Sequence, residues 1–502
     1  MTVTWSWDLQ AYISGAWTSI ARDVEAKRVP VEMWRGINGS SITDRVASPG
    51  RLSCQLDNDT SNSARLLGYY SPRHANMRTG FGRNTNIRLK FTYSGTDYYK
   101  FYGYITDLQP SIGQFKDPSS VLIATDYMQR LVEYKLKQLD VQQNKRSDEV
   151  VSTILASLPT TPLTEDLEAD AYTIRYLLSQ EQDEKTTVMG ALQKLCQSSM
   201  CYFFITGNTT NGETAVYERE ATRAGRTSSA TLNDTMTDMQ PKRSMNDVRN
   251  KLIGLTHPIR IDETAETLLY TLENEIRIPA GESITINLQF RDPNSLATRV
   301  SGLDIVTALE SGTHYRASVY PNSVDNDAAS SLTATVNAGG NATSATLENT
   351  GTVAIYVNML KIYGRGVYFY NPVEIVKESG DGDKVGTYDF YYQSDQFRAQ
   401  TMLNRLHQRA SSEEESIESV SFYADANSTL MGYAMTLDIG DKVTIVETAT
   451  GLNDLYTINN VSYIIETDGT LRCVWGLEPA DVAEYFILNS SLLDGAKVLS
   501  PY

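Results

Sequence analysis

The sequence predicts a mainly β protein with an α+β insert, on three observations. Tyrosine favours strands, and the chain has 30 Tyr against 12 Phe and 5 Trp in 502 residues. Short segments of alternating apolar and polar residues recur between Gly, Pro, Asn and Asp turns along most of the chain. Helical periodicity is concentrated in residues 147–196 and in one later segment after Asp395. A chain of this length is expected to hold about two to four domains.

Residues 1–130 are expected to form a first β domain. Residues 87–93 alternate with period two, residues 94–97 supply turn chemistry, and residues 98–105 continue as a second strand. This pattern predicts a β-hairpin.

Residues 131–225 are expected to form a small α+β module. Ser147 is positioned to cap a helix whose first turn carries Asp148 and Glu149, which suits the helix dipole. A second helix is expected to start near Thr186 or Thr187 and to lead into two strands separated by a polar turn.

Residues 226–375 are expected to form a β-sandwich, because short strands and frequent turns fill most of this span. Residues 221–242, rich in Thr, Ser and Asp, are interpreted as a linker or long loop.

Residues 376–480 are expected to return to β structure after one helix capped by Asp395. Residues 437–439 and 443–445 are interpreted as a strand pair around Gly440. Asp468-Gly469 between two alternating segments predicts a hairpin. The acidic run at 413–415 is interpreted as a solvated turn or strand edge.

The net charge of −17 argues against a protein that grips nucleic acid through a basic footprint, and no basic patch stands out. No apolar run is long enough for a membrane span, and the N-terminus lacks a signal-peptide layout. Neither the four cysteines nor the four histidines show metal-site spacing, so no metal is expected. No nucleophile, phosphate-loop or dinucleotide motif appears, so neither a catalytic residue nor a cofactor is predicted.

Two tyrosine doublets are the candidate interface residues. Adjacent strand residues face opposite sides, so one member of each pair is expected to pack inward and the other outward. Contact with another subunit or with a ligand is the functional interpretation of these side chains, and a place in the core or on the sheet surface is the alternative. We expect at least one of them to lie at a contact between subunits. The residues are Tyr69, Tyr70, Tyr391 and Tyr392.

Several segments together resemble the hub proteins of tailed-bacteriophage baseplates and tail tips. The resemblance lies in motifs of strands and turns: PGRLSCQLDN at 49–58, GYYSP at 68–72, FYGYI at 101–105 and LDIGDKVTI at 437–445. The chain departs from the family pattern in lacking Pro before Gly440.

The resemblance implies a homotrimer in which each chain adds two tube-like β-barrels to a ring on the tail axis. Residues 1–130 and 376–480 would be these barrels, and residues 481–502 would dock on a neighbour. The implied partners are the tail tube or distal tail protein, the end of the tape-measure protein, and a central tip or fibre. DNA would pass through without specific binding, and contact with the host envelope is left open without membrane insertion.

The resemblance therefore implies a structural protein of the virion, made in the bacterial cytoplasm and without enzymatic activity. Two other function classes stay open. One is a receptor-binding adhesin that recognises host surface glycans through exposed tyrosines of the sandwich. The other is a tail-associated cell-wall hydrolase that uses two carboxylates.

Overall fold

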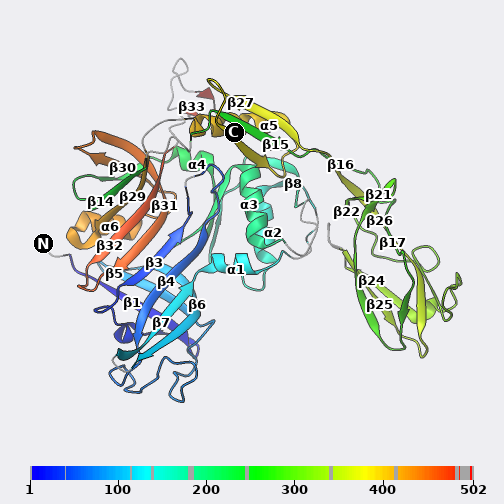
Figure 1. The fold of residues 1–502 in the computed structure, drawn as a ribbon, viewed down its shortest axis with the longest axis horizontal. Coiled ribbons are helices and arrows are strands. Elements are labelled where there is room, and N and C mark those ends of the chain that lie inside the picture. Colours follow the sequence, from blue (N-terminus) through cyan, green and yellow to red (C-terminus); the bar gives the residue numbers. More distant parts are fainter. Residues whose placement is uncertain are drawn as a thin grey trace.

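A computed structural model describes residues 3–39, 41–113, 116–136, 139, 141–178, 186–242, 248–337, 343–411, 416–480, 485–486 and 498–499. The molecule is elongated, with a wide sheet at one end, helices in the middle and a separate lobe of strands at the other end (Figure 1). The mainly β architecture and the helical insert are as predicted.

The wide sheet has thirteen strands and contains both the N-terminal and the C-terminal β segments. Its main path runs β14-β29-β32-β31-β3-β4-β7-β6-β5-β1-β2, and β30 and β13 branch from β31. The two segments meet where β3 pairs antiparallel with β31. The strands are β1 (Trp5–Ile13), β2 (Ala16–Ser19), β3 (Val31–Gly36), β4 (Ser48–Asp57), β5 (Asn86–Tyr93), β6 (Thr96–Gly113), β7 (Lys116–Thr125), β13 (Ser228–Leu232), β14 (Asp238–Lys242), β29 (Ser416–Tyr423), β30 (Lys442–Glu447), β31 (Leu452–Ile465) and β32 (Leu471–Pro479).

Each half of this sheet is rolled. Strands β13 and β14 are the two ends of a run of six strands in the C-terminal half, and five inter-strand steps would separate them by about 24 Å in a flat sheet. The chain from Leu232 to Asp238 spans at most about 21 Å, so the strands must curl. In the N-terminal half, Phe91 of β5 contacts Tyr463 of β31 with ring centroids 5.6 Å apart, although four strands lie between them in the sheet.

The expectation of two separate closed barrels is corrected by this topology. Within the described residues the strands form one continuous sheet with two rolled halves, and no pairing closes either half. In the N-terminal half, β3 pairs with β31 through the edge that closure of that half would need. In the C-terminal half, the end strands β13 and β14 do not pair with each other.

Four helices and five strands form the central part of the chain. They share one hydrophobic core with the wide sheet, so this module is packed against the sheet. The elements are α1 (Tyr127–Glu133), β8 (Gln142–Arg146), α2 (Ser147–Ala156), β9 (Glu165–Leu167), β10 (Thr173–Leu177), α3 (Val188–Ser199), β11 (Cys201–Thr206), β12 (Thr214–Arg219) and α4 (Glu220–Gly225).

Local predictions in this part were mostly right. Helix α3 begins after Thr187, whose side chain accepts from the N–H of Gly190. Helix α2 begins one residue earlier than predicted, because Ser147 is its first residue and not its cap. The interpretation of residues 221–242 as a linker was wrong, since they contain α4 and two strands of the wide sheet.

A three-stranded sheet carries helix α5, which is capped by Asp395 as predicted. These elements are β15 (Lys251–Thr256), β27 (Val373–Glu378), β28 (Val385–Phe390) and α5 (Gln396–Ala410). In the C-terminal half, α6 (Ser428–Thr436) was missed, and residues 437–439 form no strand. The acidic run at 413–415 lies outside the described residues.

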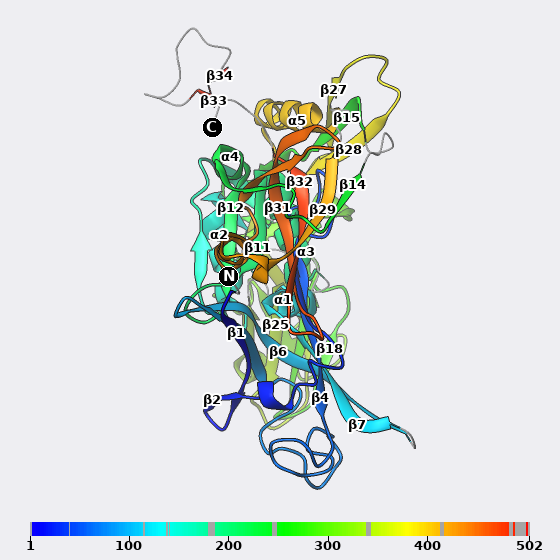
Figure 2. The same ribbon diagram turned by 90° about the vertical axis from the view of Figure 1, so that its left-hand side faces the viewer.

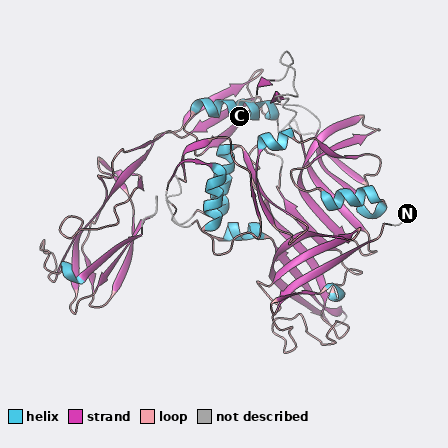
Figure 3. Cartoon of the chain, turned by 180° about the vertical axis from the view of Figure 1, so that it is seen from behind, coloured by secondary structure: helices cyan, strands magenta, loops and turns pink. Residues whose placement is uncertain are grey.

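Residues 259–369 form the distal lobe, which is built almost entirely of strands (Figure 3). Two sheets pack across one core of their own, and the long strand β26 belongs to the larger sheet. The strands are β16 (Ile259–Ile261), β17 (Thr267–Thr271), β18 (Ile276–Ile278), β19 (Ser283–Leu288), β20 (Arg291–Asp292), β21 (Ser295–Arg299), β22 (Ser301–Leu303), β23 (Tyr315–Ser318), β24 (Leu332–Asn337), β25 (Thr343–Asn349) and β26 (Ile355–Phe369).

Candidate functional site

A network of buried ion pairs lies where the wide sheet, the central module and helix α5 meet. Arg45, in the connection between β3 and β4, is 1% exposed and pairs with Glu220 of α4 at 2.6 Å. Its Nε donates to the hydroxyl of Tyr388 on β28 at 3.1 Å, and its guanidinium lies 5.0 Å from the ring centre of Tyr202 on β11. One arginine therefore joins four segments that are distant in sequence.

Glu478 of β32 is the second centre of the network. Arg409 of α5 donates to it at 2.6 Å, Arg223 of α4 approaches to 3.4 Å, and Asn459 of β31 donates at 2.8 Å. Burial disfavours the charged carboxylate, but Arg409 and Arg223 outweigh it and hold the pKa of Glu478 below its usual value. The C-terminal half of the sheet is thereby fastened to both helices.

Arg35 of β3 forms the third pair, with Asp438 at 2.5 Å. The backbone N–H of Gly207, after β11, also donates to Asp438 at 3.3 Å. Burial lowers the pKa of nearby Lys100 to about 8. Such pairs are costly to break from one side, because the remaining charge stays buried. Loss of one partner from any of these pairs is therefore expected to destabilise the junction.

Burial raises the pKa of two carboxyl groups at the junction of the sheet and the central module. Burial raises the pKa of Asp126 to about 7, and burial followed by the charge of Asp126 raises that of Glu213 to about 7. Asp126 caps α1 by accepting from the N–H of Met128, and Glu213 accepts from the N–H of Leu163. Both are at most 3% exposed, so a polymer substrate has no access to this carboxyl pair.

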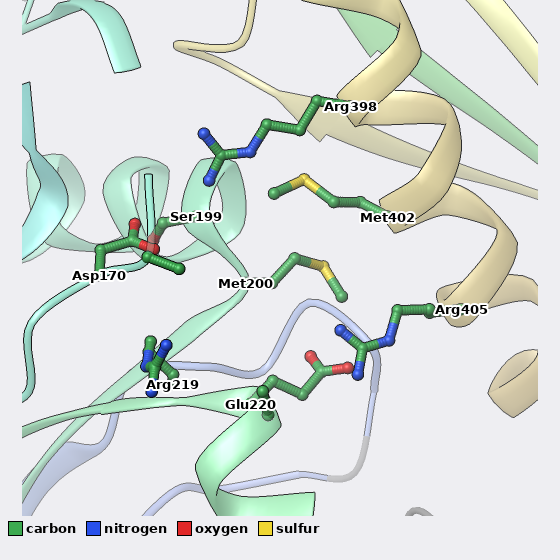
Figure 4. Close-up of a pocket in the computed structure, with 10 residues that line it drawn as sticks. Asp170, Ser199, Met200, Arg219, Glu220, Arg398, Met402 and Arg405 are labelled. Carbon is green, nitrogen blue, oxygen red and sulfur yellow. The ribbon is translucent and has the colours of Figure 1, made fainter. Parts of the chain in front are cut away.

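A small cleft, partly open to solvent, lies between α3, α4 and α5 (Figure 4). Its charged side chains are largely engaged: Arg219 with Glu168 at 2.6 Å, and Glu220 with Arg45. The hydroxyl of Ser199 bonds that of Tyr217, at 2.8 Å. The described residues of the cleft thus provide no nucleophile with an adjacent base.

The four predicted interface tyrosines divide into two classes. Tyr70 and Tyr392 are at most 1% exposed inside the chain, which leaves them no surface for a neighbouring subunit. Tyr69 is half-buried, and Arg78 lies 5.6 Å above its ring. Tyr391 is also half-buried and stacks on His257 at 6.1 Å. The interface role therefore stays a prediction for Tyr69 and Tyr391.

The connection between β4 and β5 contains a basic segment that sequence reasoning missed. Residues 60–85, here called the arginine loop, hold four arginines and no Asp or Glu. Residues 1–96 carry 12 Lys or Arg against 7 Asp or Glu, a net charge of +5 in a chain of −17. A charge count by segment would have found this patch, which the whole-chain charge conceals.

Other features of the described residues add no chemistry. The four cysteines are buried free thiols. Among the described side chains, no group of three or more His, Cys, Asp or Glu is arranged to hold a metal ion. None of the helices in the described part of the chain is long and apolar enough to cross a membrane.

Two solved structures match nearly the whole chain. The tail protein from Neisseria meningitidis MC58 aligns with a TM-score of 0.51 at 8% identity, covering 95% of this chain and 98% of that chain. The 43 kDa tail protein of prophage MuSo2 from Shewanella oneidensis aligns with a TM-score of 0.51 at 9% identity, covering 95% and 99%. The chain has a phage tail-protein fold.

This tail-protein fold is recognised through structure, since no protein-family model and no curated protein matches the chain. The motif FYGYI at 101–105 contains a glycine that the packing of two strands requires. A Cβ on Gly103 would lie 2.1 Å from the carbonyl oxygen of Thr125, so only glycine fits where β6 meets β7.

Proposed function

We propose that the chain is a non-enzymatic structural hub of a phage tail tip or baseplate. Three copies would form a ring on the tail axis and join the tail tube or distal tail protein to the central tip or fibre. The ring would also meet the end of the tape-measure protein and form part of the DNA exit channel. The observation that carries this proposal is the tail-protein fold shared over 95% of the chain.

The buried ion network supports a role in transmitting force. A hub must transmit force between tail components without opening its own junctions. Arg45 and Glu478 fasten the sheet to the helices through charge-assisted hydrogen bonds, which are shorter and stronger than neutral ones.

Particle stoichiometry tests the hub. Cryo-electron microscopy of intact tails, combined with quantitative mass spectrometry, should find three copies of the chain on the tail axis. A single copy, or copies held away from the axis, would contradict the proposal.

A second candidate, a receptor-binding adhesin, is favoured by the distal lobe. Its loop between β23 and β24 exposes 66% of Tyr320 and 81% of Val324. The loop is held by Asn358 of β26, whose side chain donates to the carbonyls of Ser323 and Asp325. Glycan-array binding by the purified chain, lost in Tyr320→Ala, would support this candidate, and peripheral copies in the particle would separate it from the hub.

A further inference from the structure

The arginine loop is an ordered surface and not a loose connection. Asn58 accepts from the N–H of Tyr70 at 2.7 Å and donates to the hydroxyl of Ser71 at 2.7 Å. Asp23 accepts from the hydroxyl of Tyr70 at 2.6 Å and from the N–H of Ser63 at 2.7 Å. A surface fixed by such buried bonds loses little conformational entropy when it binds.

The loop presents charge and apolar area together. Arg65, Arg73 and Arg83 are exposed, and the neighbouring Leu66 and Leu67 are 41% and 46% exposed. Arginine beside exposed apolar side chains is typical of protein interfaces, where lysine and acidic residues are depleted.

The loop lies at the β1–β2 end of the wide sheet and projects beyond it (Figure 2). Its Gly80 approaches Ile13, the last residue of β1, and Asp23 follows β2. Strand β2 is the last strand on this side of the main path, so the loop marks one terminus of the sheet.

The opposite part of the sheet carries the complementary charge. Asp234, Asp238 and Asp454 are exposed and Glu447 is half-exposed, around strands β13, β14, β30 and β31. These four carboxylates are here called the acidic edge. Residues 228–240 and 442–455 contain one basic residue, Lys442, which is 2% exposed and bonds the carbonyl of Ala224.

We propose that the arginine loop of one chain docks on the acidic edge of a second copy of this chain. This inference rests on the proposed homotrimer and names its contact. Opposite charges at the two ends of one sheet attract copies head to tail and repel them head to head, and a head-to-tail contact is the kind that closes into a ring. A nucleic acid is the weaker candidate for the occupant, because the rest of the chain, residues 97–502, carries 32 Lys or Arg against 54 Asp or Glu, a net charge of −22 that repels phosphates.

The test is a charge-reversal exchange in the full chain. The loop variant carries Arg65→Glu, Arg73→Glu and Arg83→Glu, and the edge variant carries Asp234→Lys, Asp238→Lys and Asp454→Lys. Each variant should raise the dissociation constant of the oligomer by about 100-fold in sedimentation equilibrium at 50 mM salt. The two variants mixed together should assemble better than either alone, because each contact between unlike variants joins opposite charges, although a three-membered ring keeps one contact between like charges. The six-fold variant should recover to within about tenfold of the parent.

The control reverses three exposed arginines of the distal lobe, Arg260, Arg277 and Arg316, and should leave the assembly unchanged. Thermal unfolding shows that each variant is folded. If the parent chain oligomerises and the loop variant oligomerises equally well, the proposed contact is wrong but the homotrimer is not contradicted. A parent that stays monomeric overturns both. If the loop and edge variants lose assembly and the six-fold variant does not recover it, the acidic edge is not the occupant. The same conclusion follows if a 30-base-pair DNA duplex binds in a loop-dependent way while the variants assemble like the parent.

Discussion

A buried arginine that loses its carboxylate partner keeps its charge, because the guanidinium does not deprotonate near neutrality. Glu220→Gln should therefore lower the free energy of unfolding by about 3–5 kcal/mol, since Arg45 would stay buried and unpaired. Guanidinium chloride unfolding followed by tryptophan fluorescence measures this change.

The matched control for that variant is Asp304→Asn, which breaks a pair with Arg365 in which the carboxylate is 59% exposed. The expected change there is within about 0.5 kcal/mol, because solvent screens such pairs. Equal effects of the two variants would contradict the importance assigned to the buried junction.

The raised pKa of Glu213 predicts how the stability of the chain depends on pH. Its pKa in the folded chain is about 7 against an ordinary 4.5, so between these values the folded state binds more protons than the unfolded state. Stability therefore falls as pH rises through this window and is constant above it. Glu213→Gln keeps an acceptor for Leu163 but removes the titration, so the variant should gain up to about 3 kcal/mol relative to the parent between pH 4 and pH 8.

Denaturant midpoints measured across this range test the prediction. The exposed Glu263→Gln serves as a control for the change of formal charge. Parallel pH profiles for Glu213→Gln and the parent would show that the carboxyl is ionised in the folded chain.

At the scale of elements, the pairing of β3 with β31 joins the two halves of the sheet. Gly36 faces Asn460 in this ladder with φ of 136°, and a Cβ there would lie 2.5 Å from the carbonyl oxygen of Asn459. Gly36→Ala should thus destabilise the chain by about 2 kcal/mol or more.

Gly15→Ala separates crowding from backbone strain, since Gly15 has φ of 86° but open space around its Cβ position. It should cost about 1 kcal/mol. Calorimetry of both variants tests the difference, and equal melting temperatures would show that the β3–β31 ladder yields to the added methyl group.

Elements with local signals, such as helix caps, could be predicted from the sequence. Elements that depend on pairing with strands distant in sequence could not. Asp395 and Thr187 cap α5 and α3 where the sequence placed these helices. Strand β13 was missed because it is five residues long, rich in Ser and Thr, and pairs with a strand some 200 residues away. The ion network could not be predicted, because Arg45 and Glu220 come together only through the tertiary fold.

At the scale of the whole molecule, the distal lobe should be dispensable for folding. It has its own core, and Ile261 pairs with Val367 at its base. Replacing residues 262–366 by Asn-Gly should close this pair as a two-residue hairpin. The shortened chain should keep the melting temperature of the remainder within a few degrees, as measured by circular dichroism, and aggregation or loss of cooperative unfolding would contradict the lobe's independence.

The joining of β3 to β31 also sets an order of events during synthesis. Strand β3 leaves the ribosome more than 400 residues before β31, its partner on one side. One edge of β3 therefore stays unpaired until residues 452–465 emerge. Contacts of such sequence separation form slowly. A translation product that stops before residue 479 therefore lacks part of β32 and cannot complete the sheet.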